Sequence, residues 1–203
     1  MTDRIAVDIV LLPPPEIADM AVEANRRLAD PAGGIALNST DCLPHISLAM
    51  GCIETGRIDQ VREVLRSIAA ETGELKLAII GVAMVTGASG IVISSLIVGK
   101  TKQLQILHER VMERLENHLD SAASAEMFAG PRPIAQSSVE WVGTFREKSA
   151  FENFVPHITI GLGRTRPLDA PVEFIPPALA LCRLGNHCTC RKVLAEVPLA
   201  PGP

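Results

Sequence analysis

The sequence has few aromatic residues and no excess of basic ones. Its 203 residues include no tyrosine, one tryptophan and five phenylalanines. Proteins that bind long single strands stack successive bases on aromatic side chains, so this class is disfavoured. The 19 lysines and arginines are outnumbered by 23 aspartates and glutamates, for a net charge of −4, whereas a protein that contacts many phosphates needs a basic surface. Extensive nucleic-acid binding is therefore not expected, and a nucleic-acid-like substrate should be small.

Long apolar runs are also missing. No segment approaches the roughly 20 apolar residues that cross a bilayer. The first apolar run, residues 5–12, contains Asp8 and ends at three prolines (13–15), so it is too short for a secretion signal followed by a cleavage site. We therefore predict a cytoplasmic protein with no membrane contact. In that compartment the five cysteines are interpreted as reduced thiols and not as a disulfide framework: Cys42, Cys52, Cys182, Cys188 and Cys190.

The chain has enough apolar residues, 47%, to bury a sizeable core, and no linker divides it. We predict a single domain over residues 1–203 in which an α+β pattern occurs twice. Residues 121–136 are interpreted as a loop or flap, and residues 86–90 as a hairpin loop. Strands are predicted over 5–12, 44–50, 75–85, 91–98, 139–145, 156–161, 178–184 and 188–197. Helices are predicted over 15–28, 58–70 and 103–119, with one or two helical turns in 148–154.

One pentad of residues occurs in each half of the chain. Residues 44–48 read Pro-His-Ile-Ser-Leu and residues 156–160 read Pro-His-Ile-Thr-Ile, a match in residue type at every position. Both are predicted to be short strands closed by a glycine. Side chains alternate along a strand, so the histidine and the hydroxyl two residues later share a face, about 6–7 Å apart.

These residue types suit proton transfer to and from one bound ligand. An imidazole titrates near neutral pH, and a hydroxyl hydrogen-bonds an oxygen of the same ligand. Two copies around a pseudo-twofold axis would let one imidazole act as base on a water while the other protonates a leaving oxygen. A single histidine in an apolar strand is usually structural, and it is the matched pair that favours catalysis. His108 and His118, in the predicted helix 103–119, are interpreted as structural or solvent-facing.

The C-terminal run 187–190, His-Cys-Thr-Cys, offers a competing interpretation as a metal site together with Cys182. Zinc needs four converging ligands, and strand alternation places Cys188 and Cys190 on the face opposite His187. Buried cysteines in a hairpin are the simpler explanation, so we predict no metal and no cofactor. His187-x-Thr189 also fits the H-x-T pattern, but it lacks the preceding proline and follows a turn. We interpret His187 as a turn-edge residue that lines the cleft.

A site that binds an anionic ligand through histidines and hydroxyls usually needs one fixed positive charge. The candidates are Arg164, Lys100 and Arg191, although each is more often an ordinary surface charge. Arg164 and Trp141 are retained as cleft-lining candidates. The core is the alternative location for Trp141, as it is for Phe154.

With an H-x-[ST]-apolar motif in each half, the sequence resembles the two-histidine (2H) phosphoesterase superfamily, which includes the 2′–5′ RNA ligase-like proteins and the cyclic nucleotide phosphodiesterases. The resemblance implies a bilobal pseudo-twofold fold, with an antiparallel sheet and outer helices in each lobe and a central cleft. It also implies metal-independent attack on cyclic or 2′-linked phosphoesters. By position, His45 and His157 would be the acid/base pair, and Ser47 and Thr159 would hold the non-bridging phosphate oxygens.

The expected activity is hydrolysis of a small cyclic phosphodiester, either a 2′,3′-cyclic phosphate end or ADP-ribose 1″,2″-cyclic phosphate, so the partner is a small nucleotide or an RNA end. Three alternatives stay open. One is 2′–5′ RNA ligase-like activity, which the acidic net charge disfavours for tRNA-sized partners. The others are a non-catalytic nucleotide-binding module of the same fold and a zinc-binding interaction protein. The sequence does not assign the base and the acid between the two histidines.

Overall fold

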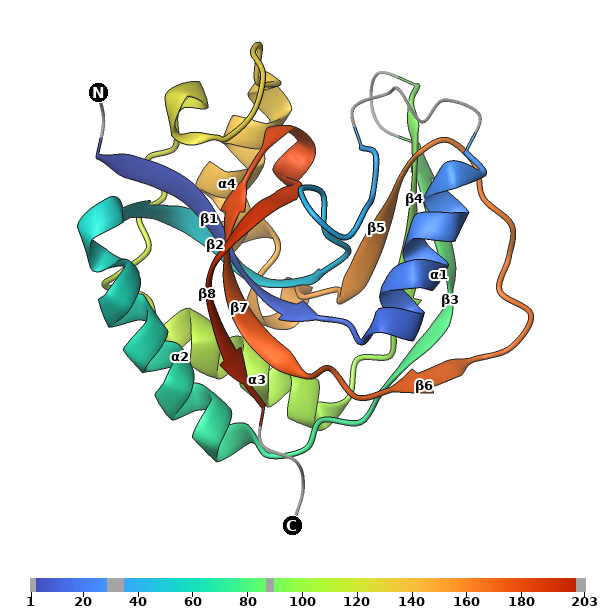
Figure 1. Ribbon diagram of the computed structural model, residues 1–203, viewed down its shortest axis with the longest axis horizontal. Coiled ribbons are helices and arrows are strands. Elements are labelled where there is room, and N and C mark those ends of the chain that lie inside the picture. The colour runs from blue at the N-terminus through green and yellow to red at the C-terminus, as the bar shows by residue number, and fades with distance from the viewer. Residues whose placement is uncertain (1–2, 29–34, 87–89, 200–203) are drawn as a thin grey trace.

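The protein forms two four-stranded antiparallel sheets with helices packed against them, in a computed structural model that describes residues 3–28, 35–86 and 90–199 (Figure 1). Sheet A has the order β2-β1-β7-β8, formed by β1 (Arg4–Leu12), β2 (Ile46–Glu54), β7 (Ala178–Leu184) and β8 (Cys190–Pro198). Sheet B has the order β5-β4-β3-β6, formed by β3 (Leu77–Thr86), β4 (Val92–Val98), β5 (His157–Leu162) and β6 (Val172–Phe174). The predicted two-lobed α+β class is confirmed.

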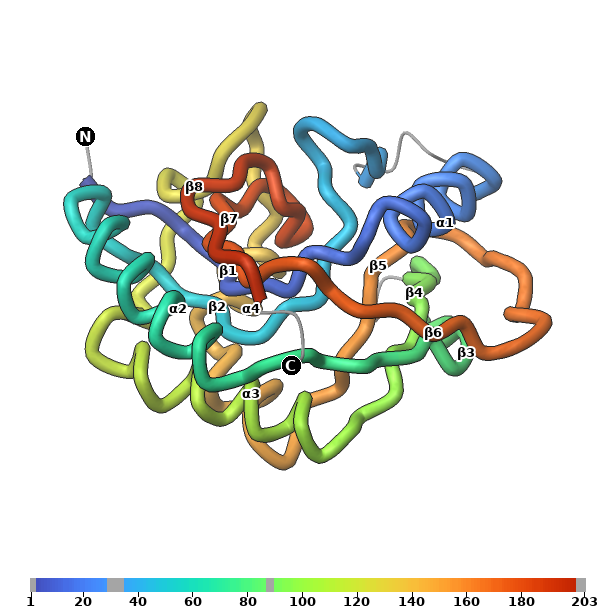
Figure 2. The backbone as a smooth tube through the Cα atoms, turned by 60° about the horizontal axis from the view of Figure 1, so that its bottom comes forward, coloured from blue at the N-terminus to red at the C-terminus, as the bar shows by residue number. Residues whose placement is uncertain are grey.

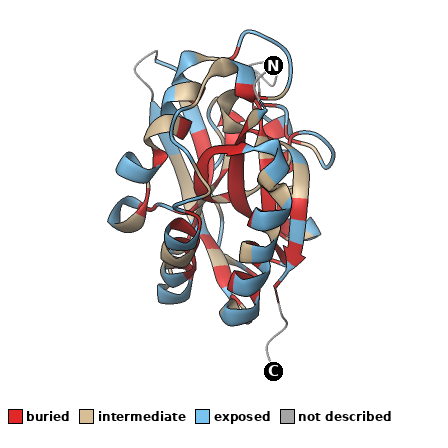
Figure 3. Cartoon of the chain, turned by 90° about the vertical axis from the view of Figure 1, so that its left-hand side faces the viewer, coloured by how far each residue is buried: buried red, intermediate tan, exposed pale blue. Residues whose placement is uncertain are grey.

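The helices are α1 (Pro15–Arg26), α2 (Ile58–Thr72), α3 (Lys102–Arg114) and α4 (Gln136–Lys148). Helix α1 contacts β5 of sheet B, whereas α2 contacts β7 and β8 and α3 contacts β2 of sheet A. Figure 2 shows α2 and α3 running side by side along sheet A. In α2 the buried residues Val61, Leu65 and Ile68 have the expected helical spacing. Buried residues line the strands and the inward sides of the helices, and exposed residues cover the outer helix surfaces (Figure 3).

Both pentad strands continue past the glycines that were predicted to end them. Strand β2 runs through Gly51 to Glu54, and β5 runs through Gly161 to Leu162. A Cβ atom at Gly51 would lie 2.9 Å from Leu119 Cβ, and one at Gly161 would lie 2.8 Å from Asn25 Nδ2. These glycines therefore permit close packing of a neighbouring segment and do not terminate the strands.

The predicted strand over residues 139–145 is wrong, because this segment lies inside α4. Its Val, Trp, Thr and Phe residues favour a strand by propensity. The buried residues of the helix, however, are Ser138, Val142 and Phe145, which follow a spacing of four and three. Packing of one helical face has overridden the local preference of the side chains.

Other boundaries differ less from the predictions. The α-helix predicted over 103–119 ends at Arg114, and the connector 164–177 contains the short strand β6. Residues 121–135 are irregular apart from a 3-10 helix at Ala125–Met127. Part of the predicted hairpin loop, residues 87–89, lies outside the described residues. No helix in the part of the chain that the structure describes is long and apolar enough to cross a membrane.

The interpretation of all five cysteines as reduced thiols is wrong for two of them. Cys182 of β7 and Cys190 of β8 form a disulfide bond, with their Cα atoms 5.6 Å apart. The two strands pair with register shifts before Cys182 and after Arg183, and residues 186–188 form a 3-10 turn that extends the turn expected before His187. This longer hairpin with its shifted register brings Cys182 and Cys190 within bonding distance. The alternation of side chains along an ideal strand does not predict this pairing.

Candidate active site

The two pentads occupy equivalent places in the two sheets. Strand β2 is the edge strand of sheet A, β5 is the edge strand of sheet B, and the two strands contact each other. Each pentad lies at the start of its strand and has the same burial pattern. The proline, the isoleucine and the final apolar residue are buried, whereas the histidine and the hydroxyl residue are partly accessible. The repeat in the sequence is therefore a repeat in the structure.

The equivalence extends to the hydrogen-bonding register. Ser47 pairs with Val10 of β1, and a register shift follows at once, so that Leu48 has no partner across the strand. Thr159 pairs with Ser95 of β4, and the same shift leaves Ile160 without a partner. A β-bulge of this kind bends the strand and redirects its side chains. Each lobe thus carries a bulge directly after its hydroxyl residue.

Both histidines are anchored through the same ring nitrogen. The Nδ1 atom of His45 lies 2.7 Å from the carbonyl oxygen of Leu43, and Nδ1 of His157 lies 2.8 Å from the carbonyl oxygen of Val155. A carbonyl oxygen only accepts hydrogen bonds, so Nδ1 carries the proton in each ring. The Nε2 atom is therefore the one left to exchange a proton with a ligand.

The His45 imidazole is more deeply placed, with 12% of its side chain exposed. Burial lowers the pKa of His45, and the charge of the nearby His157 lowers it further. The two imidazoles are thus close enough to interact electrostatically. A lowered pKa keeps His45 neutral at physiological pH, which is the state of a general base.

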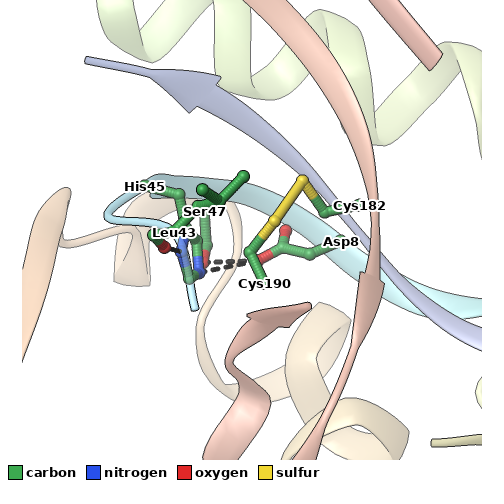
Figure 4. The surroundings of a disulfide bond; sticks show 6 residues. All are labelled: Asp8, Leu43, His45, Ser47, Cys182 and Cys190. Atoms are coloured by element: carbon green, nitrogen blue, oxygen red, sulfur yellow. Dashed lines mark hydrogen bonds and ion pairs between the residues drawn. A yellow bond between two sulfur atoms is a disulfide. The ribbon is translucent and has the colours of Figure 1, made fainter. Parts of the chain in front are cut away.

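A residue that the sequence analysis did not select lies between the histidine and the hydroxyl of the first pentad. Asp8 of β1 is completely buried, and its Oδ2 accepts a 2.6 Å hydrogen bond from Ser47 Oγ (Figure 4). The same oxygen lies 3.7 Å from His45 Nε2. Asp8 is the one charged residue in the apolar run 5–12, and this isolated acid was the available signal.

The disulfide bond and apolar side chains surround Asp8. Asp8 pairs with Cys182 across β1 and β7, and the Cys182–Cys190 bond lies beside its carboxyl group in Figure 4. Val10 and Ala180 continue this face of sheet A, and all of these residues are buried. Burial raises the pKa of Asp8 well above its usual range, although hydrogen bonding from Ser47 and from the backbone of Ala49 opposes this shift.

The equivalent position in sheet B holds an isoleucine. Asp8 lies two residues before the partner of Ser47, and Ile93 lies two residues before the partner of Thr159. Ile93 pairs with Val85 of β3, and their exposed fractions are 41% and 62%. The face of sheet B beside Thr159 is thus apolar and open, whereas that of sheet A is closed and contains an acid.

The three cleft-lining candidates lie in different places. His187 is in the 3-10 turn Asn186–Cys188, where its backbone N–H donates to Ser138 Oγ. Trp141 lies on α4 with 46% of its surface exposed, so it is not a core residue. Arg164 lines a cavity of about 530 Å³ together with Ile160, which is on the strand face opposite Thr159.

The other candidate charges are held by backbone oxygens. Lys100 Nζ donates to the carbonyl of Glu152, just before the second pentad, and lies 6.0 Å from the centre of the Phe154 ring. Arg191 donates to the carbonyl of Asp41, just before the first pentad. Among the described residues, no group of three or more His, Cys, Asp and Glu side chains is arranged to hold a metal ion.

His108 of α3 connects the surroundings of the two pentads. Its Nδ1 donates to the carbonyl of Leu48, and its Nε2 accepts the backbone N–H of Phe151. Its ring stacks on Phe154 at a centroid distance of 4.0 Å. The acceptor role of Nε2 requires a neutral ring, and burial lowers the pKa of His108 to about 4. This buried histidine is structural, as the sequence indicated.

Comparison with known proteins gives one family match. A family model for the 2′-5′ RNA ligase superfamily matches residues 13–175, a span that contains both pentads. A search of curated proteins finds no match.

Solved structures match this fold over nearly the whole chain. TT0787 of Thermus thermophilus has a TM-score of 0.64 at 14% identity, over 97% of this chain and 99% of that one. E. coli LigT complexed with NADP+ has a TM-score of 0.54 at 13% identity, over 96% of each chain. E. coli LigT complexed with 3′-AMP has a TM-score of 0.51 at 12% identity, over 97% and 99%. At these identities the likeness shows the two-lobed fold.

Proposed function

This chain belongs to the 2′-5′ RNA ligase superfamily of two-histidine phosphoesterases, and we propose that it is a metal-independent enzyme that hydrolyses small cyclic phosphodiesters. One observation carries the proposal. The two pentads lie on edge strands that contact each other, and in each one the histidine is anchored through Nδ1. This leaves the Nε2 atom of each histidine free to exchange a proton, with a hydroxyl residue two positions later on the same strand. A structural role for either histidine would not require this duplication.

His45, the less exposed of the two histidines, is suited to act as the base and His157 as the acid. His45 Nε2 takes a proton from a water molecule as the water oxygen bonds to phosphorus. The bond from phosphorus to the 2′ or 3′ ester oxygen breaks, and His157 Nε2–H gives its proton to that oxygen. The product is a phosphate monoester with a free hydroxyl. The lowered pKa of His45, caused mainly by burial, supports this division of roles.

Ser47 and Thr159 would donate hydrogen bonds to the two non-bridging phosphate oxygens. Each hydroxyl lies two residues after its histidine on the same strand face, so one phosphate group can contact both pairs. Hydrogen bonds to a charged oxygen are worth about 1.5–3 kcal/mol each. They would also stabilise the additional negative charge on the phosphorane-like transition state.

The open apolar face of sheet B supports a substrate with an uncharged ring attached to the phosphate. Ile97 and Ser95 pair with His157 and Thr159, and Ile93 and Val85 extend this face toward the solvent. E. coli LigT, which has the same fold, has been crystallised with 3′-AMP and with NADP+. We infer a nucleoside 2′,3′-cyclic phosphate, or ADP-ribose 1″,2″-cyclic phosphate, whose nucleoside part lies on this face.

The family name favours a second candidate, 2′–5′ ligation of RNA ends. The net charge of −4 disfavours it, because a tRNA-sized partner is held mainly through many phosphate contacts. A salt titration separates the two candidates. Affinity for a small cyclic phosphate should fall only modestly with added salt, whereas affinity for a long RNA should fall steeply.

The direct test is turnover of 2′,3′-cyclic AMP by the purified protein in excess EDTA, followed by chromatography of the nucleoside monophosphate. We expect full activity with the chelator. Turnover that requires added zinc or magnesium would overturn the metal-independent mechanism. No turnover of either cyclic substrate, together with tight binding of nucleotides, would favour the non-catalytic binding module.

A further inference from the structure

The mechanism proposed above makes no use of Asp8, although no other acidic side chain of the described residues contacts the first pentad as closely. Its carboxyl group is fully buried, one oxygen accepts the Ser47 hydrogen bond, and the other oxygen, Oδ1, has no hydrogen-bond partner in the described part of the chain. A buried polar atom without a partner is costly, and such atoms are retained when they serve a function.

The state of this carboxyl group determines what Ser47 can offer a ligand. A serine hydroxyl has one hydrogen and two lone pairs. If Asp8 is ionised, the Ser47 hydrogen is held by the carboxylate, and Ser47 presents lone pairs to the phosphate. If Asp8 carries a proton, its O–H donates to Ser47 Oγ across the same 2.6 Å, and the Ser47 hydrogen is free to point at a phosphate oxygen.

The surroundings favour the protonated form. The closest titratable group is His45, which directly precedes β2 and lies 3.7 Å from Asp8 Oδ2. Strands β7 and β8 contribute the Cys182–Cys190 disulfide, which does not titrate, and the turn before β8 contributes the Cys188 thiol, whose pKa is raised mainly by burial and also by Asp8. None of these groups neutralises a buried carboxylate. Burial raises the pKa of Asp8 well above its usual range, and this outweighs the opposing hydrogen bonding from Ser47 and from the backbone of Ala49.

We propose that Asp8 is a positioning residue of this active site: its protonated carboxyl group donates to Ser47 Oγ and thereby turns the Ser47 hydrogen toward a non-bridging phosphate oxygen. The inference rests on the proposed function, because it assigns Asp8 a role in phosphate binding at the same site. It applies to one lobe only, since the equivalent residue in sheet B is Ile93.

The geometry disfavours an Asp–His dyad at this site. In such a dyad the carboxylate accepts a hydrogen bond from the imidazole and fixes its tautomer. Here the carbonyl of Leu43 already fixes the tautomer through Nδ1, at 2.7 Å. The 3.7 Å from Asp8 Oδ2 to His45 Nε2 is too long for a hydrogen bond. Asp8 therefore acts through Ser47 and leaves His45 Nε2 available for water.

Two substitutions of Asp8 separate these roles. Asp8→Asn keeps the shape and a donor toward Ser47 but can never ionise, whereas Asp8→Ala removes the donor. We expect kcat/KM for 2′,3′-cyclic AMP to stay within about fivefold of wild type in Asp8→Asn and to fall about tenfold or more in Asp8→Ala, the loss typical of one hydrogen bond to a charged group. A loss of a hundredfold or more in Asp8→Asn would instead indicate an ionised dyad and would overturn the proposal.

A double-mutant cycle tests whether Asp8 works through Ser47. In a Ser47→Ala background, Asp8→Ala should have almost no further effect, and in the matched Thr159→Val background its full penalty should remain. The six proteins of these two cycles are also titrated with inorganic phosphate by calorimetry, because this readout does not depend on turnover. Equal penalties in both backgrounds would contradict the proposal. A thermal melt of each variant identifies any that fails to fold, and the Asp8→Asn result then decides.

Wild-type turnover distinguishes failure of the proposed function from failure of the role proposed for Asp8. If wild type does not hydrolyse either cyclic phosphate, the proposed function fails, and the phosphate titrations alone decide on Asp8. If wild type is active but Asp8→Ala matches it in both kcat/KM and phosphate affinity, the proposed function stands and the role of Asp8 is wrong.

Discussion

The two half-sites of this protein share their backbone and differ in their surroundings. Each has a Pro-His-Ile-hydroxyl sequence on an edge strand, a Nδ1 anchor two residues back and a bulge directly after the hydroxyl. At the equivalent position on the adjacent strand, however, sheet A has the buried Asp8 and sheet B has the exposed Ile93. The two half-sites therefore share the groups that we propose move protons, and the neighbouring strands make the two halves unequal. A closed half suits a base of lowered pKa, and an open half suits entry of the substrate.

The largest expected effects come from the two histidines. General acid–base catalysis typically contributes about 10²–10⁴ in rate, so His45→Ala and His157→Ala should each lower kcat by about that factor. Because both act in one proton-transfer cycle, the double variant should lose much less than the product of the two losses. Steady-state kinetics on 2′,3′-cyclic AMP measures this. The control is His187→Ala, for which we expect less than about a tenfold loss. A severe His187→Ala phenotype with a mild His157→Ala phenotype would mean that the second catalytic histidine had been misassigned.

His108, which bonds to Leu48 and to Phe151, makes a pH-dependent contribution to stability. Its pKa of about 4 lies below the unfolded value, so the unfolded chain binds the extra proton as the pH falls from about 6.5 to 4. The stabilisation is complete above the unfolded pKa and is lost as the pH falls through the folded pKa. Between about pH 7 and 4, the free energy of unfolding of wild type should fall by about 3 kcal/mol more than that of His108→Leu. Urea titrations at several pH values test this, and parallel curves for the two proteins would contradict it.

The hydroxyls should give smaller and more similar losses than the histidines. Ser47→Ala and Thr159→Val each remove a hydrogen bond to a charged oxygen, worth about 1.5–3 kcal/mol, which corresponds to about 10- to 150-fold in kcat/KM. Similar losses would show that both half-sites hold the phosphate. A loss confined to one hydroxyl would mean that the phosphate binds to one pentad only.

The apolar face of sheet B should affect binding more than chemistry. Ile93→Asp places a charge where the nucleoside is proposed to lie, and we expect KM for 2′,3′-cyclic AMP to rise about tenfold with little change in kcat. Ile175→Asp is the control, because Ile175 is similarly exposed but lies after β6, at the opposite edge of the sheet from β5. Equal effects of the two substitutions would indicate general electrostatic repulsion and not a binding face.

The sequence predicted the parts of this molecule that repeat or follow a period. The two pentads and the apolar spacing of Val61, Leu65 and Ile68 are local patterns, and the structure has them on edge strands and on a helix face. The features that were missed depend on partners far along the chain. The β7–β8 register that pairs Cys182 with Cys190 is not visible in sequence spacing, nor is the contact of Asp8 with Ser47. In α4, the β-propensity of individual side chains concealed a helical burial pattern.

The most direct test of the unequal half-sites is the pH dependence of kcat/KM for 2′,3′-cyclic AMP, in EDTA, for wild type and both histidine variants. We predict a bell-shaped profile whose acidic limb lies below the usual histidine pKa of about 6.5, because burial lowers the pKa of His45 and a base must be unprotonated to act. His45→Ala should lose the acidic limb and His157→Ala the alkaline limb. The reverse assignment of the limbs, or a profile that neither substitution changes, would contradict the account.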